Sequence, residues 1–166
     1  TQPLETPIAY DRIRAVEWQD GRIRLIDQRL LPAKLEYLVL ETLAEAVHAI
    51  RDMAVRGAPA IGITAAYAVV LAARARYTEN PGNWQAALVP DLHMLAEARP
   101  TAVNLRWAVE RMRALSAQLS GDPLPVLLAE AQRIHAEDIA ANHRMGELGA
   151  ALIEPGSGVL THCNTG

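Results

Sequence analysis

The sequence predicts an α+β domain, in which a small antiparallel sheet precedes a bundle of helices. Two segments of alternating hydrophobicity, residues 15–18 and 22–26, flank the turn Gln19-Asp20-Gly21, and Asp-Gly between such segments is typical of a β-hairpin. From residue 42 onward, apolar residues recur at helical spacing. The chain has 166 residues, of which 51% are hydrophobic and 21% charged, so it can build one packed core and is not a disordered chain.

The next elements follow from local signals. Residues 34–40 alternate again and predict a third strand. Thr42 and Glu45 then fit a capping box, in which each side chain accepts a hydrogen bond from the backbone of the other residue and so starts a helix. The apolar residues of this helix are Leu43, Val47, Ile50 and Ala54. We expect Gly57 to end it as a left-handed cap.

A second helix is predicted from Pro59, because proline suits the first helical turn. Residues 57–73 carry no charge. The uncharged run is shorter than the about 20 residues that a membrane span requires, and it is rich in Ala, Gly and Thr. It therefore predicts a helix buried in a soluble core, with no membrane as partner.

Three more helices are expected. Apolar spacing predicts the first from Trp84 to Leu95, ended by Arg99-Pro100, and Thr101 is expected to cap the next. The apolar stripe of that fourth helix is Leu105, Ala108, Val109, Met112, Leu115 and Leu119. A long fifth helix is predicted over residues 123–153, with a stripe through Leu127, Ala131, Ile134, Asp138, Asn142, Met145 and Gly149. Because two polar residues fall on this stripe, we expect them to form a buried polar network.

The last residues predict the start of another unit. Residues 154–158 are typical of a turn, and residues 159–161 predict a short buried strand. A buried strand needs neighbours, and none follows in the sequence. We therefore divide the chain into an N-terminal domain, residues 1–153, and the beginning of a second domain, residues 154–166. Alternatively, the strand joins the N-terminal sheet, from which about 110 mostly helical residues separate it.

Composition excludes several functions. The net charge of −3 gives no electrostatic basis for nucleic acid or an anionic membrane as main partner. One cysteine excludes a disulfide framework and a multi-cysteine metal cluster, and His135 and His143 are too far apart for a zinc-helix motif. A dinucleotide-binding glycine motif is absent, so no dinucleotide cofactor is expected. The first ten residues do not resemble a signal peptide, which favours a cytoplasmic protein.

Two arginines precede predicted helix starts and are candidates for anion binding. Arg56 lies just before a helix whose first N–H groups, expected at Ala60, Ile61 and Gly62, could bind a phosphate with help from the helix dipole. Arg99 stands in the same relation to the next helix, and two guanidinium groups could hold one phosphate between them. In the alternative interpretation, both are solvated arginines beside ordinary helix turns.

Cys163 is the candidate for chemistry. It lies just beyond the predicted final strand, where ligands bind in open α/β sheets, and could act as a nucleophile, a proton carrier or a hydrogen-bond donor. His162 would point to the opposite face of such a strand, whereas Thr161 shares the face of Cys163. Alternatively, Cys163 is a buried structural residue.

Three segments together resemble signature segments of the methylthioribose-1-phosphate isomerases of methionine salvage. They are Val-Arg-Gly-Ala-Pro-Ala-Ile-Gly at residues 55–62, Arg-Pro-Thr-Ala-Val-Asn-Leu at 99–105 and Leu-Thr-His-Cys-Asn-Thr-Gly at 160–166. The resemblance extends to Asp27-Gln28 with Leu31-Pro32, and to Glu137-Asp138 with Asn142. It implies a largely helical N-terminal domain with a small sheet, then a Rossmann-like domain, usually in a homodimer. The implied reaction is an aldose–ketose isomerisation of 5-methylthioribose 1-phosphate without metal or nucleotide.

The resemblance also assigns roles. It implies that Arg56, Gly57, Ala58 and Arg99 bind the sugar phosphate and that Cys163 is catalytic. A second catalytic group, an Asp in the Rossmann-like domain, would lie beyond Gly166, so we expect the 166 residues to hold half a site and to be inactive alone. A C-terminal half or a second chain would supply the rest.

The same superfamily includes isomerases of ribose 1,5-bisphosphate and of 5-deoxyribose 1-phosphate, and non-catalytic regulatory subunits of translation initiation factor 2B. These are the alternatives. A cysteine hydrolase is less favoured, because no partner acid or oriented base is visible near Cys163.

Overall fold

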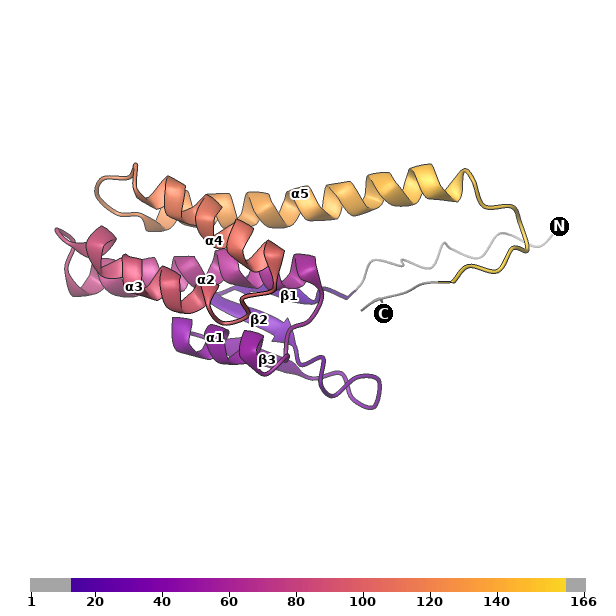
Figure 1. Ribbon diagram of the computed structural model, residues 1–166, viewed down its shortest axis with the longest axis horizontal. Coiled ribbons are helices and arrows are strands. Elements are labelled where there is room, and N and C mark those ends of the chain that lie inside the picture. Colours follow the sequence, from indigo (N-terminus) through magenta and orange to yellow (C-terminus); the bar gives the residue numbers. More distant parts are fainter. Residues whose placement is uncertain (1–12, 161–166) are drawn as a thin grey trace.

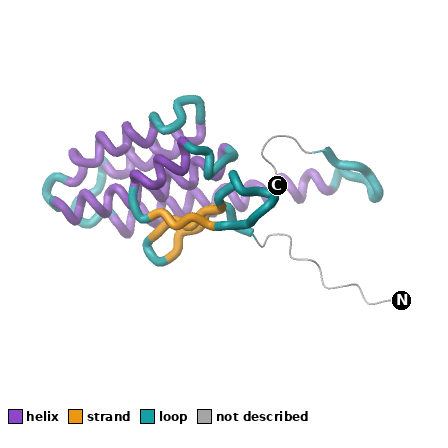
Figure 2. The backbone as a smooth tube through the Cα atoms, turned by 90° about the horizontal axis from the view of Figure 1, so that it is seen from below, coloured by secondary structure: helices purple, strands orange, loops and turns teal. Residues whose placement is uncertain are grey.

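The computed structural model describes residues 13–160 and has the predicted α+β architecture. A three-stranded antiparallel sheet lies against one side of a helical bundle (Figure 1; Figure 2). The strands are β1 (Val16–Gln19), β2 (Arg22–Ile26) and β3 (Tyr37–Leu40), with β2 in the middle. The helices are α1 (Leu43–Arg51), α2 (Ala58–Glu79), α3 (Trp84–Ala96), α4 (Val103–Ser116) and α5 (Leu124–Ala150).

The predicted hairpin is confirmed. Gln19 pairs with Arg22, and the two turn residues Asp20 and Gly21 have φ angles of 51° and 75°, as expected for a tight hairpin turn. The third strand begins at Tyr37, later than predicted. The reason is that the Lys34 N–H donates to the Leu30 carbonyl (2.9 Å) within a turn, so it is not available to the sheet.

The capping box at the start of α1 is confirmed, because the Glu45 N–H donates to Thr42 Oγ1 (3.2 Å) and the Thr42 N–H to Glu45 Oε2 (2.9 Å). The predicted end of this helix is wrong. The chain leaves α1 after Arg51, and Met53 takes the left-handed conformation with a φ of 57°. Gly57 instead precedes α2 as its N-cap, with a φ of 90° that a side chain would disfavour.

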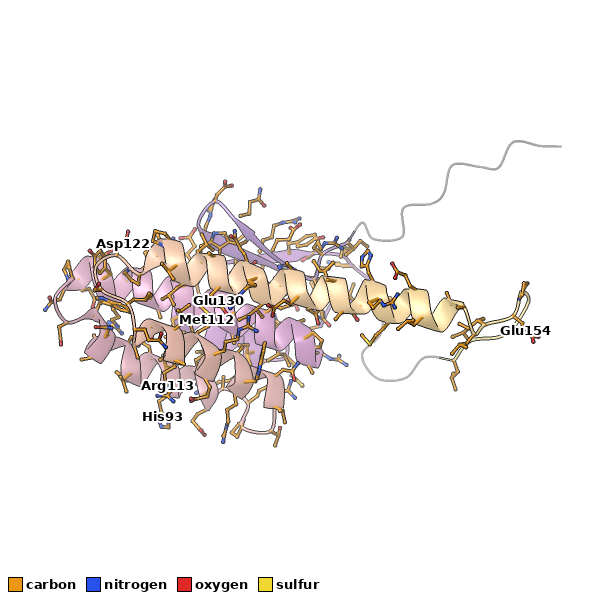
Figure 3. All side chains as sticks on the ribbon, turned by 90° about the horizontal axis from the view of Figure 1, so that it is seen from above. His93, Met112, Arg113, Asp122, Glu130 and Glu154 are labelled. Carbon is orange, nitrogen blue, oxygen red and sulfur yellow. The ribbon has the colours of Figure 1, made fainter. Side chains whose placement is uncertain are left out.

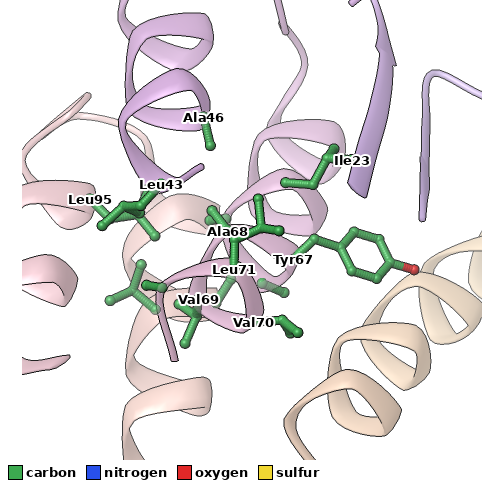
Figure 4. Packing of buried hydrophobic residues seen from close by; sticks show 14 of the residues in the cluster. Ile23, Leu43, Ala46, Tyr67, Ala68, Val69, Val70, Leu71 and Leu95 are labelled. Atoms are coloured by element: carbon green, nitrogen blue, oxygen red, sulfur yellow. The ribbon is translucent and has the colours of Figure 1, made fainter. Parts of the chain in front are cut away.

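Helix α2 forms the centre of the domain, as its uncharged sequence predicts. Every residue from Ile61 to Ala73 is buried, because α1, α3, α4, α5 and the sheet all pack around it. Figure 4 shows its side chains pointing in different directions into the core, with Tyr67 reaching toward α5. By length and composition α2 could cross a membrane, but 72% of its apolar window is buried within the domain, as expected for a core helix.

Helix α3 is confirmed and ends before Arg99-Pro100. The capping role predicted for Thr101 is wrong. The Ala102 N–H donates to the Arg99 carbonyl (2.9 Å) in a turn, which makes Ala102 the N-cap of α4, without a side-chain cap.

Helix α5 is confirmed, but only its first half packs on the bundle. Leu127, Ala131 and Ile134 are buried, whereas the C-terminal part of the helix extends past the other elements (Figure 1; Figure 3). The predicted buried network is therefore wrong: Asn142 does donate to Asp138 Oδ2 (3.2 Å), but on an exposed face.

The predicted strand is not formed at Val159 and Leu160, which are 65% and 95% exposed. None of the strands within residues 13–160 lies beside them, so they have no backbone to pair with. Thr161 lies outside the described residues. The division at residue 153 therefore stays a prediction.

Candidate active site

The beginnings of α2 and α4 meet against the middle of α5 and enclose a cleft of about 340 Å³. Its lining comes from three elements: Pro59, Gly62 and Ile63 from α2, Val103, Asn104 and Trp107 from α4, and Ile134, Glu137 and Asp138 from α5. Asn104 and Trp107 thus lie side by side with residues of α2 in the lining. The cleft thus joins two of the three segments that carry the family resemblance.

The approach of α2 to α4 depends on Gly62. A methyl group in place of its hydrogen would lie 3.1 Å from the Asn104 carbonyl oxygen and 3.4 Å from the Asn104 Cβ. The distance to the carbonyl oxygen is tighter than nearly all carbon contacts, so a side chain at this position requires the Asn104 backbone to shift by a few tenths of an ångström.

The start of α2 presents free backbone N–H groups. The Ile61 N–H donates to the Gly57 carbonyl (3.0 Å), which is the first bond of the helix. The unpaired amides therefore precede Ile61, at Gly57, Ala58 and Ala60, because Pro59 has none. The sequence predicted free N–H groups at Ala60, Ile61 and Gly62. This prediction is confirmed for Ala60 and wrong for Ile61 and for Gly62, which lies further into the helix. The positive end of the helix dipole lies at the same place.

A loop far away in the sequence supports the Arg56 backbone. Gln28 Nε2 donates to the Arg56 carbonyl (3.0 Å), and the Gln28 N–H donates to the Ala54 carbonyl (2.8 Å). The neighbouring Asp27 is buried and accepts two hydrogen bonds from the Arg29 guanidinium, at 2.8 and 2.7 Å. Those bonds lower the pKa of Asp27 despite its burial. The side chain of Arg56 itself is exposed.

Arg99 lies in the turn before α4 and is half-buried. Pro59 and Val103, which line the cleft, follow Arg56 and Arg99 within one helical turn along the chain. The two arginine segments therefore lead to the same cleft, although neither guanidinium lines it. That both groups hold one phosphate stays a prediction. Cys163, with Thr161 and His162, lies outside the described residues, and its role also stays a prediction.

A hydrogen-bond network that the sequence did not predict supports one wall of the cleft. Arg111 on α4 donates to both carboxylate oxygens of Glu137 on α5, at 2.9 and 3.3 Å, and also to Glu130. Its guanidinium lies 5.2 Å from the centre of the Trp107 ring. The hydrogen bonds from Arg111 lower the pKa of Glu137, which keeps this carboxylate ionised. Within residues 13–160, no three His, Cys, Asp or Glu side chains gather as a metal site would require.

Comparison with known proteins places the chain in a family. Residues 54–166, more than half of the chain, match the initiation factor 2 subunit family. The chain belongs to this family. A relative from Methylococcus capsulatus named methylthioribose-1-phosphate isomerase is 55% identical over 158 residues. That alignment covers 95% of this chain but 45% of the relative, so the chain spans about half the length of the curated relatives it matches.

Two solved structures from the same family have this fold. One is 5-methylthioribose 1-phosphate isomerase from Pyrococcus horikoshii, with a TM-score of 0.79 and 35% identity, covering 86% of this chain and 41% of that one. The other is the delta subunit of the translation initiation factor eIF-2B from A. fulgidus, with a TM-score of 0.80 and 38% identity, covering 87% and 43%. The resemblance drawn from the three sequence segments is therefore confirmed at the level of the family.

Proposed function

We propose that this chain is the N-terminal part of a methylthioribose-1-phosphate isomerase, which converts 5-methylthioribose 1-phosphate into 5-methylthioribulose 1-phosphate. The observation that supports this most is the 55% identity to a protein of that name, which extends over nearly the whole chain. Two regions named by the resemblance, residues 56–58 and 99–105, lead to one cleft, which is consistent with a shared substrate site.

The phosphate would bind at the start of α2. The N–H groups of Gly57 and Ala58 and the helix dipole attract a phosphate dianion, and the guanidinium groups of Arg56 and Arg99 would add charge-assisted hydrogen bonds. In this arrangement, Gln28 acts as a support, because it fixes the backbone that carries Arg56. Binding the phosphate would hold the sugar in one orientation for the steps that follow.

The reaction then needs two events. An acid protonates the ring oxygen so that the closed sugar opens, and the hydrogen at C2 moves to C1 while the C2 hydroxyl becomes a carbonyl. In the proposed enzyme, Cys163 carries the proton or stabilises the charge that develops between C2 and C1. The acid is an Asp from a Rossmann-like second domain, as the resemblance implies. We further propose a cytoplasmic homodimer that needs no metal or nucleotide, with the 166 residues inactive alone.

An activity assay of the natural full-length polypeptide tests this function. We expect conversion of 5-methylthioribose 1-phosphate, and a loss of turnover in Cys163→Ala. Wild-type turnover in that variant would refute the role of Cys163. A panel that includes ribose 1,5-bisphosphate and 5-deoxyribose 1-phosphate decides between this substrate and the related ones.

A second candidate is a regulatory subunit of the initiation-factor type. It is favoured by the A. fulgidus structure, which is as similar in fold as the isomerase from P. horikoshii. Co-purification with a translation factor, together with no isomerase activity on any sugar of the panel, would support this candidate over the enzyme.

A further inference from the structure

The charged side chains that line the cleft between α2, α4 and α5 are acidic, although one of them, Glu137, is paired with Arg111. The charged lining residues of the cleft are Glu137 and Asp138, and no cationic side chain is among the described residues that line it. Because Arg111 is already engaged by Glu137 and the described lining supplies no other cationic donor, the cleft offers the phosphorylated end of a substrate no charged partner. Carboxylates are strong acceptors for hydroxyl groups, which suits the uncharged part of a sugar.

The cleft directly adjoins the segments that would hold the phosphate. Pro59 follows Ala58 in the chain and lines the cleft, and Val103 and Asn104 follow Arg99 within about one turn of α4. A sugar bound through its phosphate at Gly57 and Ala58 would therefore have its carbon skeleton near α4 and α5.

Glu137 is held in a geometry that leaves it able to accept further hydrogen bonds. Arg111 donates one hydrogen bond to each of its oxygens, at 2.9 and 3.3 Å, and fixes the side chain against α4. The Glu137 side chain is still 50% exposed, with Arg133 Nε 3.9 Å from its Oε1. Because each carboxylate oxygen can accept about two hydrogen bonds, both retain capacity for a ligand.

Helix α4 lends the cleft an apolar surface and an amide. Trp107 is 48% exposed although it is a large aromatic residue, and its ring lies beside Arg111 and lines the cleft. Aromatic faces pack well against the C–H groups of sugars and against thioethers. Asn104 adds both a donor and an acceptor. A carboxylate, an amide and an aromatic ring around one cleft form a typical surface for a polyhydroxylated ligand.

We propose that Glu137 binds the hydroxyl groups of the sugar phosphate and sets specificity for them, with Arg111 as the residue that positions it. This inference rests on the proposed function, because it assumes a sugar phosphate bound at the start of α2. It adds a substrate-binding residue on α5 to those proposed at the starts of α2 and α4.

The test compares Glu137→Gln with Glu110→Gln in the natural full-length polypeptide. Glu110 is a suitable control, because it is exposed on α4 and pairs with Arg113, away from the cleft. For Glu137→Gln we expect a KM for 5-methylthioribose 1-phosphate at least about tenfold higher, since hydrogen bonds to charged groups contribute most to affinity. Glu110→Gln should leave the KM unchanged.

Deoxy analogues separate hydroxyl binding from a general structural effect. The 2-deoxy and 3-deoxy analogues of the substrate are measured as competitive inhibitors. For at least one of them, Glu137→Gln should weaken inhibition less than twofold, because the missing hydroxyl is the one that Glu137 binds. Arg111→Met should raise the KM in the wild-type background but not in the Glu137→Gln background.

The outcomes are distinguishable. If the wild-type protein shows no isomerase activity, the proposed function fails. If the wild type is active and Glu137→Gln has the same KM as Glu110→Gln, or weakens both analogues as much as the substrate, the role of Glu137 is refuted. Should Glu137→Gln melt more than about 10 °C below the wild type, Glu137→Asp replaces it, with the same analogue comparison.

Discussion

Replacing Gly62 with alanine tests whether the starts of α2 and α4 are in contact. The added methyl group would lie 3.1 Å from the Asn104 carbonyl oxygen, so α4 must move by a few tenths of an ångström. Alanine also favours a helix over glycine by about 1 kcal/mol, which would mask part of the steric cost. A matched control removes this effect: Gly146 lies within α5, and a methyl group there meets nothing within 4 Å.

The difference in the free energy of unfolding between Gly62→Ala and Gly146→Ala then measures the cost of crowding Asn104. Gly146→Ala should raise the free energy of unfolding by about 0.5–1 kcal/mol, as expected for an exposed helical glycine. Gly62→Ala should be less stable than Gly146→Ala by about 1–3 kcal/mol, the usual cost of extra volume in a packed position. Urea unfolding followed by circular dichroism measures both values.

Gly62→Ala should also affect catalysis. In the natural full-length polypeptide, a shift of a few tenths of an ångström between the two segments proposed to bind the substrate should lower kcat/KM by about threefold to tenfold, given that a displacement of 1 Å can cost 10²-fold. Equal stability and equal kcat/KM in the two variants would refute the close approach of α2 and α4 at this position.

Two further predictions concern buried charge and titration. Arg76 donates two hydrogen bonds, at 2.7 and 2.8 Å, to the buried carboxylate of Asp91, so Arg76→Met should destabilise the domain by about 3 kcal/mol in urea unfolding; a loss below about 1 kcal/mol would contradict this pairing. Burial, and then the positive charge of Arg14, lower the pKa of His135, so the unfolded chain binds this proton more readily than the folded domain. The contribution of neutral His135 to the free energy of unfolding should therefore be fully present above about pH 6.5. It should be lost as the pH falls through the lower pKa of the folded domain. His135→Gln should flatten that part of the stability profile and His93→Gln, at an exposed position, should not; an unchanged slope in His135→Gln would contradict the burial effect.

Elements with signals within a few residues could be predicted from the sequence. Asp20-Gly21 specifies the hairpin, Thr42 with Glu45 specifies the start of α1, and Pro59 marks the first turn of α2, because each acts on the backbone within a few residues of itself. Gly57 shows the limit of such signals. A glycine between two helices can end the first or precede the second, and the left-handed turn at Met53 decides this in the structure.

Features that depend on tertiary contacts could not be predicted. The bond from Gln28 to Arg56 joins residues 28 positions apart, and the bonds from Arg111 to Glu137 join two helices, so no local pattern indicates either. The stripe along α5 correctly predicts a helix, but it does not reveal which part of that helix is covered. Asp138 and Asn142 fall on the stripe, yet Asp138 lines the cleft and the hydrogen bond between the two side chains is exposed.

The most direct test of the central claim is a crystal structure of the natural full-length polypeptide with 5-methylthioribulose 1-phosphate bound. We expect the phosphate at the start of α2, within about 3 Å of the Gly57 and Ala58 amides and of both the Arg56 and Arg99 guanidinium groups. The sugar carbons should lie in the cleft toward Glu137. A phosphate that contacts neither arginine, or a sugar bound away from the starts of α2 and α4, would contradict the claim.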